Sequence, residues 1–146
     1  MTDKIRCILL VDDERMFHWI FEDACSILNI SLTLKAIDSA DRADQLFADW
    51  KNAPEGRPEC VFVDLNLIGS TYNGIELVRR INKIHGNGVV IGIISSSTDP
   101  AEIEKAKQVG AQFWIVKSDD LEPRLEAFHQ SYDSYVDRTA PFRVFA

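Results

Sequence analysis

The sequence predicts a doubly wound α/β fold, in which helices cover both faces of a parallel sheet. Five short apolar segments alternate with segments of helical periodicity, the order expected of parallel strands joined by helical crossovers. The apolar segments lie at residues 5–11, 32–37, 60–65, 89–94 and 112–116. The first, third and fourth are apolar almost throughout, which is typical of strands buried on both faces. We therefore expect a five-stranded sheet with the strand order 2-1-3-4-5.

Capping residues indicate where the helices between these strands begin and end. Candidate N-caps precede three of the expected helices, namely Ser39, Asn73 and Asp99. Glycine is expected to end two of them, at Gly86 and Gly110. A last helix is expected over residues 119–135, and residues 139–146 follow it as a C-terminal tail.

Composition and charge fit one globular domain over residues 1–138. The chain has 146 residues, 46% of them hydrophobic, which suffices for one core. Its net charge of −7 argues against nucleic acid and anionic lipid as partners. No segment approaches the roughly 20 apolar residues of a membrane helix. Since the N-terminus also lacks the pattern of a signal peptide, we expect a cytoplasmic protein without membrane contact.

Polar side chains stand where four of the expected strands end. Asp12 and Asp13 follow the first strand, Asp64 lies near the end of the third, a run of serines beginning at Ser95 follows the fourth, and Lys117 follows the fifth. The carboxyl ends of parallel strands meet at one edge of a sheet, so these groups are expected to converge. Clustered carboxylates repel one another unless a cation intervenes, and Mg²⁺ prefers oxygen ligands. A carboxylate beside Mg²⁺ can attack a phosphoryl donor, giving an aspartyl phosphate whose charge nearby donors balance.

The ordered motifs ILLVDDE, VFVDLNL, IISSS and VGAQFWIVK resemble the receiver domains of two-component response regulators. The resemblance spans about residues 5–125 and implies the flavodoxin-like (βα)₅ fold of the CheY-like superfamily. It also implies that residues 1–138 are one receiver domain, phosphorylated by a histidine kinase or a histidine phosphotransfer protein. Such a protein is a phosphoacceptor rather than a turnover enzyme. With no attached output domain expected, its signal would pass to an unknown downstream protein.

The resemblance assigns roles to individual residues. Asp64 resembles the phosphoacceptor, and its expected helpers are Lys117 and Ser95. The expected Mg²⁺ ligands are Asp12, Asp13, Asp64 and the backbone carbonyl of Asn66. Trp114 takes the place of the switch aromatic, while Asn66 and Ser97 occupy positions that tune the phosphoryl lifetime. We prefer Ser95 to the serines after it because it directly follows the strand and precedes Lys117 by 22 residues.

The loop after Asp64, LNLIGSTYNG, departs from the family pattern. It is longer than usual and lacks the typical proline, which predicts a different partner contact or altered access to Asp64. The resemblance leaves open a homodimer through the fourth helix, fifth strand and fifth helix. The tail, with Phe142, Val144 and Phe145, could dock on a partner or a second copy.

Other interpretations of the same residues remain. Asp64 and Lys117 could form a purely structural ion pair, or the chain could be a pseudo-receiver that is never phosphorylated. A phosphohydrolase of the haloacid-dehalogenase type would also use an aspartate nucleophile, but Asn66 stands where that family has its acid/base. A flavin-binding domain is disfavoured because the acidic DDER loop would repel a phosphate.

Overall fold

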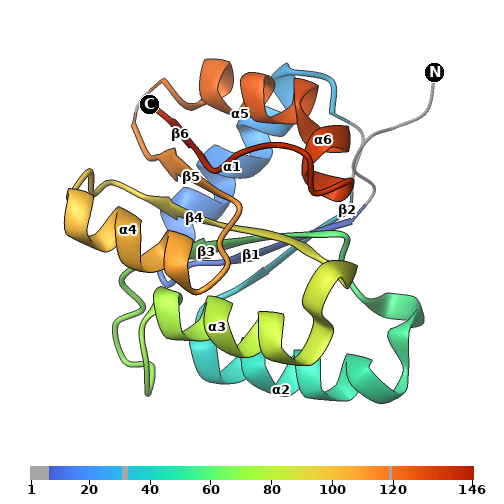
Figure 1. Cartoon of the computed structure of the whole chain (residues 1–146). Helices are drawn as coiled ribbons and strands as arrows, with labels where there is room; N and C mark the ends of the chain where they lie inside the picture. The colour runs from blue at the N-terminus through green and yellow to red at the C-terminus, as the bar shows by residue number, and fades with distance from the viewer. Residues whose placement is uncertain (1–6, 31–32, 119) are drawn as a thin grey trace.

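One parallel sheet forms the centre of the protein (Figure 1). The computed structural model describes residues 7–30, 33–118 and 120–146. Its strands are β1 (Cys7–Val11), β2 (Thr33–Ile37), β3 (Cys60–Asp64), β4 (Val90–Ser95), β5 (Phe113–Val116) and β6 (Arg143–Phe145). The first five occupy the segments that the sequence predicts. Residues 5, 6, 32 and 119, expected at the ends of elements, lie outside the described residues.

Helices cover both faces of this sheet. The helices are α1 (Arg15–Ile27), α2 (Ala40–Asn52), α3 (Gly74–His85), α4 (Pro100–Gln108), α5 (Leu121–Gln130) and α6 (Tyr132–Val136), with 3₁₀ turns η1 (Pro54–Gly56) and η2 (Gly86–Gly88). In Figure 1, α1, α5 and α6 lie on one side of the sheet, and α2 and α3 lie on the other. No helix in the described part of the chain is both long and apolar enough to cross a bilayer.

The predicted caps are present in the structure. Ser39 Oγ accepts a hydrogen bond from Arg42 N at 3.2 Å, and Asn73 Oδ1 accepts one from Glu76 N at 3.1 Å. Asp99 caps α4 through Ala101 N at 3.0 Å. These bonds satisfy backbone donors that a helix leaves free in its first turn.

Alternating strand residues build the two halves of the core. In β1, Leu9 and Val11 pack on the side of α2 and α3, with Phe47 among their neighbours. Ile8 and Leu10 pack on the opposite side, with α1 and α5. This alternation follows from the two-residue period of a strand, and it buries both faces of the sheet.

The sheet has six strands in the described part of the chain, so the expectation of five was wrong. The extra strand, β6, comes from residues 139–146, which the sequence analysis treated as a tail. It pairs in parallel with β5, with Trp114 opposite Val144. Phe145 is 2% exposed, with its ring centroid 5.9 Å from that of Phe128 and 6.4 Å from that of Tyr135. Burial of this ring explains why so short a segment joins the sheet.

The last predicted helix is divided in two. Instead of one helix over residues 119–135, α5 ends at Gln130 and α6 begins at Tyr132. Ser131 Oγ donates to Ala127 O at 3.0 Å, and Ser134 Oγ donates to Ser131 O at 2.6 Å. Serine hydroxyls that bond backbone carbonyls compete with helical bonds and bend helices, so these two serines account for the break.

Candidate functional site

Four strands deliver charged or polar groups to one edge of the sheet. Asp12 follows β1, Asp64 ends β3, Ser95 ends β4 and Lys117 follows β5. Asp12, Asp64 and Ser95 are buried, with residue exposures of 0%, 5% and 1%. Topology alone accounts for this convergence, because all the strands run in the same direction.

Lys117 is the centre of the charged cluster. Its Nζ lies 2.6 Å from Asp12 Oδ2, 3.5 Å from Asp64 Oδ1 and 3.4 Å from Glu14 Oε1. The same ammonium lies 4.3 Å from the ring centroid of Phe17, a favourable cation–π arrangement. With one side on an aromatic ring and the other on carboxylates, the lysine head group has a fixed position.

The carboxyl group of Asp64 is strongly perturbed. Burial raises its pKa from 3.8 to about 7, and repulsion from Asp12 and Asp13 adds to this effect, while Lys117 opposes it. Burial lowers the pKa of Lys117, but its hydrogen bond to Asp12 and the nearby carboxylates outweigh burial and raise that pKa. The ionised carboxylates at this site therefore carry more negative charge than one lysine neutralises.

The acidic cluster can hold a divalent cation. Asp12, Glu14 and Asp64 each offer a carboxylate oxygen, and these oxygens lie within 4.8 Å of one another. An all-oxygen set with excess negative charge suits a hard cation such as Mg²⁺. Sequence reasoning had not included Glu14, although it directly follows the acidic pair in the DDE motif.

Asp13, the expected direct ligand, makes a different contact. Its Oδ2 accepts a hydrogen bond from the backbone N–H of Ile68 at 3.1 Å, which ties the loop after β3 to the site. Asp13 is not one of the three residues whose carboxylate oxygens lie within 4.8 Å of one another. Asn66 is exposed in the same loop, two residues beyond Asp64.

The predicted switch residues lie in one connected network beside the site. Ser95 Oγ accepts from Ser97 N at 3.1 Å, and Lys117 N donates to Ser95 O at 2.8 Å. Ser97 Oγ donates to Glu102 of α4 at 2.7 Å, and Ser97 O accepts from Trp114 Nε1 at 3.1 Å. The Trp114 side chain is fully buried. This network joins the end of β4 to both α4 and β5.

Comparison with known sequences identifies the family. The sequence pattern of the response regulator receiver domain matches residues 8–128, most of the chain. The chain belongs to the response regulator receiver family. No curated protein matches this receiver by overall sequence similarity.

Solved receiver structures share its fold. The phosphorylated cyanobacterial phytochrome response regulator RcpA has a TM-score of 0.68 at 18% identity, with 93% of this chain and 96% of that chain covered. The Mn²⁺-bound response regulator Rcp1 has a TM-score of 0.68 at 16% identity, covering 93% and 98% of the two chains. The signal receiver domain of an HD domain-containing protein from Pseudomonas fluorescens Pf-5 has a TM-score of 0.75 at 21% identity, with 94% of each chain covered.

Proposed function

We propose that this receiver accepts a phosphoryl group on Asp64 from a histidine kinase or a histidine phosphotransfer protein, in a reaction that requires Mg²⁺. The position of Asp64 carries this proposal, because its buried carboxylate faces Lys117 at 3.5 Å and shares that lysine with Asp12. If these residues had only a structural role, the single ammonium of Lys117 would have to offset two buried carboxylates, those of Asp12 and Asp64. That excess charge favours a cation site over a structural role.

The chemistry is a transfer between two nucleophiles. An oxygen of Asp64 forms the new P–O bond as the P–N bond of the donor histidine breaks, and the electron pair of that bond remains on the imidazole nitrogen. Mg²⁺, when bound, offsets the negative charge on the phosphoryl oxygens. Lys117 is held beside Asp64 by Asp12 and Phe17, so its ammonium can donate to a phosphoryl oxygen without a large movement. We propose that the protein acts as a phosphoacceptor and does not turn over small phosphate esters.

Phosphorylation is proposed to act on the network around Ser95. The new negative charge attracts the Ser95 hydroxyl, which now accepts from Ser97 N. Ser97 in turn contacts Trp114 and Glu102, so a shift there reaches β5 and α4. This is a local electrostatic change that biases the surface around α4 and β5, where we propose that a downstream protein binds.

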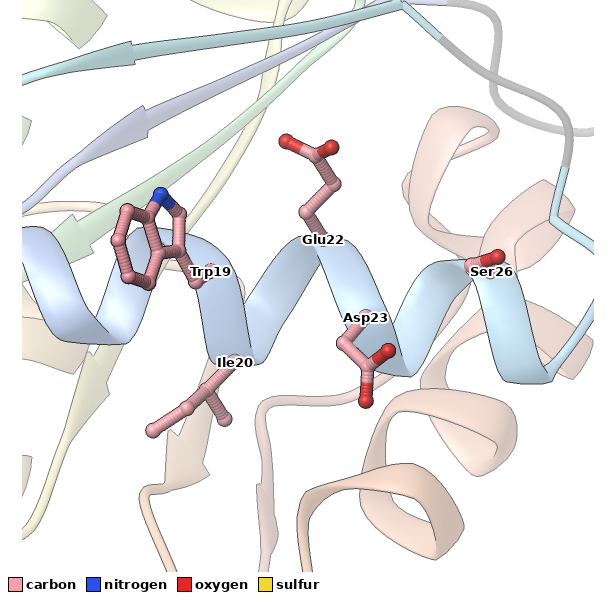
Figure 2. A pocket seen from close by; sticks show the side chains of 5 residues that line it. All are labelled: Trp19, Ile20, Glu22, Asp23 and Ser26. Atoms are coloured by element: carbon pink, nitrogen blue, oxygen red, sulfur yellow. The ribbon is translucent and has the colours of Figure 1, made fainter.

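The outer face of α1 is the surface that we propose for the phosphodonor. Met16, Trp19 and Ile20 are exposed by 64%, 72% and 44%, and they lie just beyond the acidic residues in the chain. Figure 2 shows the shallow pocket on this helix, with Trp19 and Glu22 on one side and Ile20 and Asp23 on the other. Exposed apolar side chains of this size, rimmed by acids, are typical of a protein-binding surface.

The resemblance leaves open a homodimer through α4, β5 and α5, and the sixth strand changes what such an interface would contain. In this chain β6 lies along β5, so β5 is not an edge strand. Any dimer on this side would include β6, whose Arg143 and Val144 are exposed.

Labelling with small phosphodonors tests the proposal. Incubation with Mg²⁺ and acetyl phosphate is expected to add one phosphoryl group per chain, measured by intact mass, and EDTA should prevent it. Asp64→Asn should abolish the adduct. Asp133→Asn, which removes an exposed carboxylate on α6, should label like the wild type. An adduct on the Asp64→Asn variant would contradict the choice of acceptor, and steady hydrolysis of phosphate esters without an adduct would indicate a phosphohydrolase.

A further inference from the structure

The long loop between β3 and α3 has a fixed conformation. Gly74 N donates to Leu65 O at 2.9 Å and closes the loop at its base. Ser70 N donates to Leu67 O at 3.1 Å and forms a turn within it. The Leu67 side chain is 5% exposed and packs in the core. The loop therefore has its own internal bonds and a buried anchor.

Side chains also attach the loop to the start of α2. Ser70 Oγ accepts from Ala40 N at 3.0 Å, and Asp41 Oδ2 accepts from Thr71 N at 3.1 Å. These reciprocal bonds satisfy one donor of the helix and one of the loop. The extra length of the loop therefore allows it to contact the first turn of α2.

Tyr72 adds a third attachment. The guanidinium carbon of Arg80 lies 4.1 Å from the centroid of the Tyr72 ring, and Arg80 also pairs with Asp44 of α2 at 3.5 Å. The loop is thus held between α2 and α3 on one side and the acidic site on the other.

Ile68 is the exception to this packing. Its side chain is 84% exposed, the largest exposure among the big apolar residues that the structure describes. Its backbone N–H is bonded to Asp13 Oδ2 at 3.1 Å, which places Ile68 at the rim of the acidic site. The loop after β3 buries Leu67 and bonds its own polar groups. It nevertheless presents Ile68 to solvent at the rim of the acidic site.

Apolar side chains are also exposed on α1, the helix that follows the acidic residues in the chain. Met16, three residues after Asp13, is 64% exposed, and Trp19 follows it at 72%. A protein that approaches the acidic site over the loop after β3 would contact Ile68. Acetyl phosphate carries a single methyl group, so it offers no extended apolar surface that Ile68 could contact.

We propose that Ile68 is a specificity-determining residue, which contacts an apolar surface of the protein that donates the phosphoryl group. This inference rests on the proposed function, since it presumes that Asp64 is phosphorylated. The rigid loop holds the isoleucine in place before the donor arrives, so little conformational freedom is lost on contact. Ile68 selects for a protein donor and leaves small phosphodonors unaffected.

The test compares protein and small-molecule donors on the same variants. The protein donor is the autophosphorylated histidine kinase or phosphotransfer protein that labels the wild type fastest in a panel from the source organism. Ile68→Ser keeps the backbone N–H that bonds Asp13. We expect it to lower the kcat/KM of phosphotransfer from this donor about tenfold, and to leave the rate of labelling by acetyl phosphate within about twofold of wild type.

Two further variants serve as controls. Ile68→Leu keeps the apolar contact and should transfer within about twofold of wild type. Ile84→Ser removes a partly exposed isoleucine at the C-terminal end of α3 and should have no effect with either donor. Equal loss with both donors would place the effect at the chemical site and overturn the inference, as would wild-type rates for Ile68→Ser. A wild-type protein that only acetyl phosphate labels would also overturn it. If neither donor labels the wild type, the proposed function itself fails.

Discussion

Replacing Asp64 by asparagine should stabilise the protein when no metal is present. In the metal-free fold, the carboxyl of Asp64 has a pKa of about 7 instead of 3.8, because of burial and of repulsion from Asp12 and Asp13. One pKa unit corresponds to about 1.4 kcal/mol, so the ionised carboxylate costs the folded state roughly 4 kcal/mol above pH 7. Asparagine has nearly the same shape and no charge, and it removes this cost.

The sign of the pH dependence follows from the raised pKa. The folded protein binds the Asp64 proton more tightly than the unfolded chain, so the cost grows between about pH 4 and pH 7 and is complete above pH 7. The gain from Asp64→Asn is therefore expected to be about 4 kcal/mol at pH 8 and about 2 kcal/mol at pH 5.5. Urea unfolding in EDTA at the two pH values measures both.

The matched control is Asp133→Asn, which changes an exposed carboxylate and should leave the free energy of unfolding within about 0.5 kcal/mol of wild type at both pH values. An Asp64→Asn protein that is less stable than the wild type at pH 8 would refute the reasoning. It would mean that the ion pair with Lys117 stabilises the fold more than burial of the charge and the repulsion from Asp12 destabilise it.

Three other perturbations test the site and the sixth strand. At 10 mM Mg²⁺, taken as about a hundred times the dissociation constant, the free energy of unfolding of the wild type should rise by about 3 kcal/mol. That of Asp64→Asn should rise much less. Equal increases for the two proteins, measured by urea unfolding, would place the ion elsewhere. Phe145→Ala should lower the free energy of unfolding by about 3 kcal/mol, because it removes a buried aromatic ring that packs on Phe128. Val144→Ala on the same strand should lower it by under about 1 kcal/mol. Similar values for the two variants would show that β6 adds little to the stability of the fold. At Gly74, a Cβ would overlap the carbonyl oxygen of Asp64, so Gly74→Ala must displace the backbone at the proposed phosphoacceptor. It should slow labelling by acetyl phosphate at least tenfold, and an unchanged rate would show that this backbone contact does not position Asp64.

The elements that the sequence predicted correctly are those with strong local signals. The apolar segments at β1, β3 and β4 are nearly continuous, and side-chain caps start α2, α3 and α4. Each of these signals depends on residues close together in the chain. Pairing partners were not needed to find them.

The sixth strand lacked such a signal. It has only three residues, and its stability comes from Phe145, whose ring packs on Phe128 and Tyr135 from a different part of the chain. The pairing of Trp114 with Val144 joins residues far apart in sequence. A segment of three residues, one of them an arginine, is equally consistent with a tail, and only the geometry of the sheet distinguishes the two.

The location of the candidate site could be predicted for a different reason. In a parallel sheet, every strand delivers its last residue to the same edge, so Asp12, Asp64, Ser95 and Lys117 converge whatever the details of packing. Contacts within the edge do depend on packing. The contact of Glu14 with Lys117 and the bond between Asp13 and the loop after β3 depend on how the loops pack around the strands. For that reason the sequence located the edge that carries the proposed phosphoacceptor, while the arrangement of the acidic side chains there, and the position of Ile68, required the folded protein.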